Sequence, residues 1–387
     1  MKCILCNFIV EEMQSYDWLV PNIGLRRIGF SICKKCGLVQ QSPSLNEKEL
    51  RLYYRDLAIY TNPGREGKPD PRNIAMVDEQ IKFITRGIGY LPKKVFQVGS
   101  SDGYTLNTFR EKGSNDVFGI EPTQNSCLFA KQRYNVLCEN KAIEDFKFTS
   151  PYDLILLTHV LEHLENPIDA LYKCRKAHED LPVGYIYIEV PLLDKTKTLC
   201  PGLFTLEHRF YFSRAKITEL IENAGYEPIS IVEHYEAEIY PVIGILASTK
   251  SLTYTKQDPE NEYVQTKSLL AGYFKNEKEY WGNKYTQIYD KLKSADKIYI
   301  WGAGAHTSLL FSNTSILNDF KIDGILDSAK SKWGLSYGQW KCMQPKKSIF
   351  SDNCAILISS YNSEDEIFNT IKKTMIGSVT PIKFHSC

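Results

Sequence analysis

Short apolar runs bounded by glycines and polar residues recur through the middle of the chain. The runs at 95–98, 117–120 and 154–158 are each followed by a stretch with helical periodicity, and 184–191 is a further run of the same kind. Apolar runs of this length, rich in branched residues and bounded by turn residues, are typical of buried strands. Because they alternate with helical stretches, the pattern predicts an α/β fold with a doubly wound, Rossmann-like sheet.

The same order of elements returns near the C-terminus. A charged, amphipathic stretch at 258–294 predicts a long helix, and apolar runs follow at 297–301, 322–326 and 354–358. The first of these runs leads into Gly302-Ala303-Gly304 and a helical stretch. We therefore expect a second, smaller Rossmann-like unit at the C-terminus. The short glycine signal is too weak to predict a dinucleotide there.

Four cysteines mark the N-terminal segment. Cys3 and Cys6 form one C-x-x-C pair, and after 26 intervening residues Cys33 and Cys36 form a second. Two such pairs let four thiolates converge on one tetrahedral ion, and a site closed by four thiolates is structural rather than catalytic. The spacing therefore predicts a structural Zn²⁺ in a small module, built as a two-stranded ribbon with an inserted loop.

Length and the linker regions divide the chain into three predicted domains. At about 150 residues per domain, 387 residues allow two or three. A stretch rich in Gly, Pro and charge ends near residue 72. We expect a zinc-binding module and linker at 1–72, a central domain at 73–255 and the C-terminal Rossmann-like domain at 256–387.

Charge and hydropathy exclude several classes of partner. The formal net charge is +1, which gives no electrostatic signature for nucleic acid or an anionic membrane. No stretch approaches the roughly 20 apolar residues that span a bilayer. The first twelve residues, MKCILCNFIVEE, turn acidic too early for a signal peptide. We therefore expect a cytoplasmic protein with reduced thiols, no membrane contact and no nucleic-acid partner.

The turn after the first central run carries the first candidate binding residues. Gly99 and Gly103 enclose Asp102, and an acidic residue there would repel a pyrophosphate but attract a cationic amine, as in S-adenosylmethionine (SAM). Glu121, which lies 22 residues beyond Gly99, ends the next strand and is placed to bind ribose hydroxyls. Asp145 follows in an acidic turn, where it is expected near the adenine amine.

The stretch 158–167, THVLEHLENP, holds His159, Glu162 and His163 in the order H-x-x-E-H. This order also occurs in inverted zinc-peptidase motifs. Such a site requires both histidines on one regular helix and a third ligand elsewhere, whereas these histidines follow directly on a strand. A catalytic or binding role at the strand end is favoured. The alternative is that Glu162 and His163 orient the loop without touching a substrate.

Together these motifs resemble class I SAM-dependent methyltransferases over about Lys93–Lys250. The segment 97–104 resembles the first motif of that family, with Gln97 at a position that is usually acidic, 118–122 the second, and 157–167 the fourth. The resemblance implies SAM as cofactor. The cofactor-binding residues that we expect are Gln97, Gly99, Asp102, Gly103, Glu121, Asp145 and His159.

The three-part organisation resembles a narrower group, the zinc-containing nucleotide-sugar C-methyltransferases. These enzymes methylate C3 of dTDP-linked 4-keto-deoxysugars. The resemblance implies a nucleotide-sugar substrate, SAM and a structural Zn²⁺, and it is weakest over the C-terminal third. O- or N-methylation of a sugar in polysaccharide or natural-product biosynthesis is the alternative.

The segment 203–213, LFTLEHRFYFS, resembles the part of that group which carries the catalytic base. His208 matches the base and Glu207 the carboxylate beside it. His163 matches a histidine that binds or polarises the sugar. Tyr60 lies about where the linker contributes a tyrosine that faces the substrate. These four residues are the expected catalytic set.

One position departs from the pattern of the group. Thr205 stands where a tyrosine is usual, which leaves open a different sugar, a different methylated atom or a donor shifted to Tyr211. Considered alone, His208 would be a surface histidine at the start of a helix capped by Ser213.

Two other classes of protein compete with this interpretation. A zinc-ribbon protein that binds or modifies RNA would have the cysteines but lacks a basic run here. A non-catalytic scaffold would keep the fold, and tight cofactor binding would exclude it.

Overall fold

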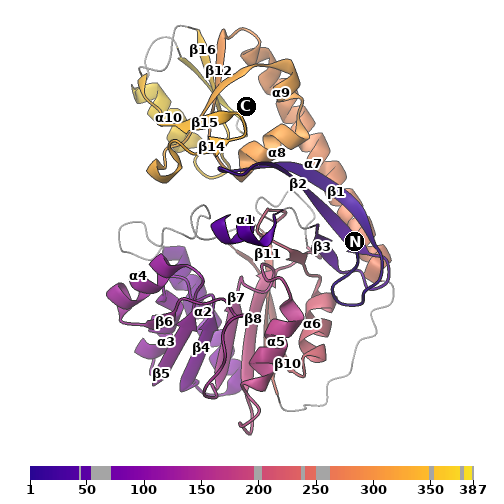
Figure 1. Cartoon of the computed structure of the whole chain (residues 1–387), viewed down its shortest axis with the longest axis vertical. Helices are drawn as coiled ribbons and strands as arrows, with labels where there is room; N and C mark the ends of the chain where they lie inside the picture. Colours follow the sequence, from indigo (N-terminus) through magenta and orange to yellow (C-terminus); the bar gives the residue numbers. More distant parts are fainter. Residues whose placement is uncertain are drawn as a thin grey trace.

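The fold is described from a computed structural model of the chain. The described residues are 1–42, 45–53, 71–195, 203–236, 240–249, 262–347, 353–374 and 379–385. They contain three β-sheets. Figure 1 shows the central sheet and the C-terminal sheet at opposite ends of the molecule, with the N-terminal strands and one long helix between them.

The N-terminal sheet is a long hairpin extended by two short strands. It has the order β1-β2-β3-β9 and all its pairings are antiparallel. The strands are β1 (Val10–Val20), β2 (Gly24–Cys33), β3 (Val39–Gln41) and β9 (Phe210–Tyr211). The two cysteine pairs are thus joined by one continuous hairpin, so the predicted inserted loop was wrong. Strand β9 comes from the central part of the chain, next to His208, and ties it to this sheet.

The central sheet has seven strands in the order β10-β11-β8-β7-β4-β5-β6, and all are parallel except β11. The four predicted strands are confirmed as β4, β5, β7 and β8. The strands are β4 (Lys94–Val98), β5 (Asp116–Ile120), β6 (Leu137–Glu139), β7 (Leu154–Thr158), β8 (Tyr185–Pro191), β10 (Glu227–Glu236) and β11 (Tyr240–Ser248).

Helices cover both faces of this sheet, as a doubly wound fold requires. Buried side chains of α2 and α3 pack on one face, and those of α5 and α6 pack on the other. The helices are α1 (Glu47–Leu52), α2 (Pro71–Ile88), α3 (Tyr104–Glu111), α4 (Gln124–Tyr134), α5 (Pro167–Lys176) and α6 (Arg214–Asn223). The chain runs from β4 outward to β6 and then returns to β7, so the topological switch lies between β4 and β7. Ligands of such sheets bind beyond the carboxyl ends of the strands at that point.

The C-terminal unit is a second Rossmann-like sheet, as predicted. Its order is β14-β15-β13-β12-β16-β17, and all strands except β14 are parallel. The elements are α7 (Glu262–Leu292), β12 (Lys297–Trp301), α8 (Ala305–Asn313), α9 (Ile316–Asp319), β13 (Ile322–Leu326), η3 (Lys330–Lys332), β14 (Ser336–Tyr337), β15 (Trp340–Met343), β16 (Cys354–Ile358), α10 (Glu364–Thr374) and β17 (Val379–Lys383).

The N-terminal hairpin connects the two larger units. Its side chains pack with α7 and α8 in one continuous apolar cluster, and the backbone N–H of Leu19 donates to Ser308 Oγ of α8 at 3.0 Å. Figure 1 shows the hairpin running beside α7. Helix α2 begins at Pro71, one residue before the predicted boundary at 72, and the second predicted boundary, at 255, lies outside the described residues. None of the described helices has the length and apolarity to cross a membrane.

Candidate active site

The turn after β4 is shaped by residues in the left-handed region. Gly99 has φ = 65°, Ser101 has φ = 47° and Gly103 has φ = 80°. A Cβ at Gly99 would lie 2.6 Å from Val160 Cγ2, and one at Gly103 would lie 2.7 Å from Ala130 Cβ. Both glycines therefore let the turn pack closely against its neighbours, in addition to presenting backbone toward the switch point.

Two carboxylates hold this turn. Glu121 accepts hydrogen bonds from the backbone N–H groups of Ser101 at 3.1 Å and Thr123 at 2.9 Å, so it joins the end of β5 to the turn. Asp102 accepts a bond from the N–H of Tyr104 at 3.0 Å. Burial raises the pKa of both carboxyl groups above the usual value. Both predicted binding residues thus lie at the turn, and part of their hydrogen-bonding capacity is used to shape it.

At the end of β7 the chain makes a turn rather than a helix. His159 has φ = 52°, its N–H donates to Glu189 O at 2.9 Å, and α5 begins only at Pro167 with Asn166 as its N-cap. The H-x-x-E-H order of a zinc peptidase therefore does not fall on a regular helix. His159 and His163 instead both lie close to the same carboxylate oxygen, Oε1 of Glu162.

Glu162 is the centre of this cluster. Its side chain is 1% exposed, and its Oε1 lies 3.4 Å from His159 Nδ1 and 3.8 Å from His163 Nε2. Burial alone raises the pKa of the Glu162 carboxyl, but the neighbouring imidazoles, His159 first, more than compensate and hold the net pKa below its usual range. The carboxylate is therefore ionised, and its negative charge lies beside the imidazoles of His159 and His163.

His208 completes the cluster from a separate segment. Ligand-type atoms of Glu162, His163 and His208 lie within 4.8 Å of one another, and the two imidazole centroids are 4.9 Å apart. His208 Nδ1 lies 2.8 Å from Leu203 O, so this nitrogen carries the proton and Nε2 keeps its lone pair. His163 Nδ1 faces a backbone carbonyl in the same way, Glu207 O at 3.1 Å.

The surroundings of His208 keep it neutral. Its residue exposure is 6%, and burial together with the nearby His163 lowers the pKa of its imidazole to about 4. A neutral imidazole with a free Nε2 is a proton acceptor. The surface-histidine alternative considered above is therefore wrong, because the side chain points into the protein.

Comparison with known proteins identifies the reaction class. Residues 78–231, from α2 into β10, match the family described as a methyltransferase domain. The protein is a SAM-dependent methyltransferase. The matched region contains the Gly99–Gly103 turn and the histidine cluster.

Individual relatives of the enzyme are distant. It is 25% identical over 218 residues to the tRNA U34 carboxymethyltransferase of Helicobacter pylori, covering 51% of this chain and 82% of that protein. The corresponding Idiomarina loihiensis protein is 25% identical over 163 residues, 38% of this chain and 49% of its own length. Among solved structures, magnesium protoporphyrin IX methyltransferase from Synechocystis with bound S-adenosylhomocysteine has 15% identity and a TM-score of 0.42 over 53% of this chain and all of that chain.

The residues around the turn fit the cofactor of the methyltransferase. Gln97 is buried, and its Nε2 donates to Thr158 Oγ1 at 3.3 Å. Its Oε1 receives no hydrogen bond from the described residues, which leaves an acceptor for an ammonium group at the switch point. Asp145 is exposed on the turn after β6, and its predicted place beside the adenine stays a prediction.

Segments outside the predicted set shape the catalytic loop of the enzyme. Gln41 Nε2 donates to Thr205 O at 2.8 Å, His208 O at 3.2 Å and Leu206 O at 3.3 Å. Tyr53 donates to the Glu207 carboxylate. Sequence reasoning missed both residues, because nothing local marks a glutamine or tyrosine whose partners lie more than 150 positions away.

Two predicted tyrosine roles have different outcomes. Tyr60 lies outside the described residues. The Tyr211 hydroxyl donates to His208 O at 2.8 Å, so it braces the loop backbone and does not replace the phenol missing at Thr205. Thr205 Oγ1 in turn accepts from the His208 N–H at 3.4 Å, which is a further bond within the loop.

The four N-terminal cysteines converge as predicted. Their sulfurs lie within 4.8 Å of one another, with Cys3 and Cys36 at 3.6 Å and Cys6 and Cys33 at 3.4 Å. Each pair forms the same turn: Cys3 N–H bonds to Phe8 O as Cys33 N–H does to Leu38 O. Four thiolates about 2.3 Å from a tetrahedral Zn²⁺ would be about 3.8 Å apart, so the spacing fits that ion.

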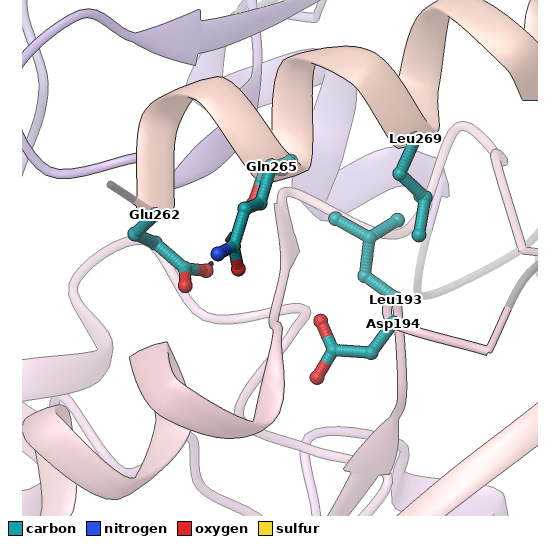
Figure 2. Close-up of a pocket in the computed structure, with 6 residues that line it drawn as sticks. Leu193, Asp194, Glu262, Gln265 and Leu269 are labelled. Atoms are coloured by element: carbon teal, nitrogen blue, oxygen red, sulfur yellow. Dashed lines mark hydrogen bonds between the residues drawn. The ribbon is translucent and has the colours of Figure 1, made fainter. Parts of the chain in front are cut away.

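A pocket of about 210 Å³ lies apart from these residues, between the start of α7 and the loop after β8. Figure 2 shows the carboxylates of Asp194 and Glu262 and the amide of Gln265 facing it. Asp194 accepts from the Arg214 N–H at 2.7 Å, and Glu262 accepts from Thr266 Oγ1 at 3.2 Å. These carboxylates are engaged in holding α6 and α7.

Proposed function

We propose that the enzyme methylates the carbon next to the ketone of a nucleotide-linked deoxysugar, with His208 as general base. The observation that carries the proposal is a buried, neutral imidazole whose Nδ1 bonds to Leu203 O and whose Nε2 is left to accept a proton. A base positioned in this way contributes typically 10²–10⁴ in rate.

The proposed reaction has two steps, proton removal and methyl transfer. His208 Nε2 removes the proton from the carbon alpha to the ketone, and the electron pair delocalises onto the ketone oxygen as an enolate. Bound SAM supplies an electrophilic methyl group. The carbon then forms a bond to that methyl as its bond to sulfur breaks, and S-adenosylhomocysteine leaves. His163, which lies beside both Glu162 and His208, would donate to the enolate oxygen.

We assign residues at and beside the Gly99–Gly103 turn to the parts of SAM that they would contact. Gln97 would hold the ammonium group, Glu121 the ribose hydroxyls, and Gly99, Asp102 and Gly103 the backbone that faces them. His159 would border the methyl group. We also infer that Cys3, Cys6, Cys33 and Cys36 hold a structural Zn²⁺, because their thiols form two matching turns with the correct spacing.

A substrate panel tests the proposal. The purified enzyme is incubated with SAM and, separately, dTDP-4-keto-6-deoxyglucose, dTDP-glucose and bulk tRNA, and S-adenosylhomocysteine formation is measured. Turnover of the keto sugar alone is expected. Turnover of dTDP-glucose would favour O-methylation. Turnover of tRNA alone, the substrate class in the names of the curated relatives, would overturn the proposal.

A further inference from the structure

A line of alternating histidine and glutamate side chains runs from the histidine cluster to the edge of the central sheet. Its middle member is His159, whose Nδ1 lies 3.4 Å from Glu162 Oε1 and whose Nε2 lies 3.5 Å from Glu189 Oε1. Both nitrogens of one imidazole thus face buried carboxylates. The ring is fixed there by the left-handed backbone of His159 and by the bond from its N–H to Glu189 O.

The outer end of the line reaches solvent. Glu189 Oε2 lies 3.3 Å from His234 Nε2, and the His234 side chain is 34% exposed whereas that of Glu189 is 0% exposed. The two residues belong to β8 and β10, which are separated by β11. They meet because β11 has Gly244 opposite Glu189, where a Cβ would lie 2.5 Å from the Tyr187 hydroxyl.

The inner end of the line is the proposed base. Glu162 Oε1 lies 3.8 Å from His163 Nε2, and His208 contributes a ligand-type atom within 4.8 Å of both residues. A small side-chain movement would bring each neighbouring pair within hydrogen-bond distance, or one water molecule could bridge it.

We propose that this line is a proton relay that carries the proton taken up by His208 to solvent at His234. The proposal rests on the proposed function, because each C-methylation leaves one proton on a base that is buried. The proton passes from His208 to Glu162 and then to Nδ1 of His159. A second proton leaves Nε2 of His159 for Glu189. It then passes to His234 and from there to water. One proton enters and one leaves, so the relay returns to its starting charge after the rings reorient.

A purely structural role explains only part of this arrangement. Glu189 already accepts from Gln80 Nε2 at 2.7 Å and from the Tyr187 hydroxyl at 2.6 Å, which would satisfy a buried carboxylate. The two histidines, His159 first, and the Tyr187 hydroxyl hold the net pKa of Glu189 well below its usual range, despite burial. The partly exposed His234 also contacts the Glu189 carboxylate, at the position where β11 has Gly244, and so connects that carboxylate to water.

The test uses proton exchange at the substrate carbon. The full-length enzyme with S-adenosylhomocysteine is mixed with dTDP-4-keto-6-deoxyglucose in D₂O, and deuterium uptake at C3 is followed by NMR. His234→Ala is compared with wild type and with Glu233→Gln, a neighbour on β10 that pairs with Lys195 and Arg214 instead. Binding of S-adenosylhomocysteine is measured for each protein as a check on folding.

The relay predicts that His234→Ala exchanges about tenfold more slowly than wild type in dilute buffer and recovers when imidazole is added, as a missing proton carrier is replaced. Glu233→Gln stays at the wild-type rate. Equal exchange by His234→Ala and wild type would refute the relay alone. A wild-type enzyme that neither exchanges nor methylates the keto sugar would refute the proposed function, and the relay with it.

Discussion

Gln41 offers a specific test of how the N-terminal sheet acts on the catalytic loop. Its carboxamide has two N–H groups and reaches three loop carbonyls, those of Thr205, Leu206 and His208. Gln41→Met keeps the approximate volume and removes the donors. Two hydrogen bonds of about 0.5–1.5 kcal/mol each are lost, so the ordered loop is destabilised by about 1–3 kcal/mol.

Loss of these hydrogen bonds should lower the turnover rate and leave cofactor binding unchanged. A tenfold change in rate corresponds to about 1.4 kcal/mol, and a base displaced by 1 Å loses about a hundredfold. We therefore expect kcat to fall about tenfold to a hundredfold, whereas KM for SAM changes little, because the carboxylates that hold the Gly99–Gly103 turn, Glu121 and Asp102, bond to Ser101 and Tyr104 rather than to the loop that Gln41 holds. Steady-state kinetics with both substrates varied measures the two effects.

Gln40→Met is the matched control. Gln40 is the neighbouring residue on β3, is equally buried, and hydrogen-bonds to the Ile4 N–H and Lys2 O beside the cysteines instead. It is expected to affect metal retention more than turnover. If Gln41→Met retained kcat within about twofold of wild type, other contacts would hold the loop and the assigned role of Gln41 would be wrong.

Three further predictions concern the base, the metal and pH. His208→Ala is expected to lower kcat at least a hundredfold while a titration shows unchanged S-adenosylhomocysteine affinity; wild-type turnover would exclude His208 as base. Cys33→Ser should lose zinc, measured by atomic absorption, together with melting temperature; a variant with unaltered metal content would rule out the four-thiolate site. Burial lowers the pKa of His208 and His178 to about 4, so the native state binds fewer protons than the unfolded chain between pH 4 and 6.5. The free energy of unfolding should therefore fall as pH drops through that window, by at most about 3 kcal/mol per histidine. Burial raises the pKa of Glu277 to about 7, so this carboxyl stabilises the native state as pH drops from 7 to about 4.5 and opposes the effect of the histidines. Denaturant titrations of Glu277→Gln should therefore show the free energy of unfolding falling more steeply with decreasing pH than in wild type. A free energy of unfolding that does not change with pH in that variant would contradict the lowered pKa values of the histidines.

Regular elements with strong local patterns could be predicted from the sequence. The apolar runs at 95–98 and 154–158 became central strands, and the paired cysteines converged, because period and spacing are local properties. The turn glycines and Glu121 lie at one turn for the same reason, and their contacts with the cofactor stay a prediction.

Contacts between distant segments could not be predicted in this way. Strand β9 joins the N-terminal sheet, and Gln41 reaches the His208 loop, although nothing in either local pattern indicates a partner. The two-stranded ribbon between the cysteine pairs was predicted, but the inserted loop was not found: both strands are long because they bury one face against α7 and α8, which the sequence does not show to be neighbours. The His159–Glu189 contact likewise depends on which strands are adjacent.

The position of the transferred methyl group on the product shows which atom the enzyme methylates. The enzyme would be incubated with dTDP-4-keto-6-deoxyglucose and SAM carrying a ¹³C-labelled methyl group, and the product examined by two-dimensional NMR. We predict a methyl carbon bonded to the sugar carbon next to the ketone, formed by wild type and lost in His208→Gln. A methyl bonded to oxygen or nitrogen, or a carbon-bound methyl formed equally well by His208→Gln, would contradict it.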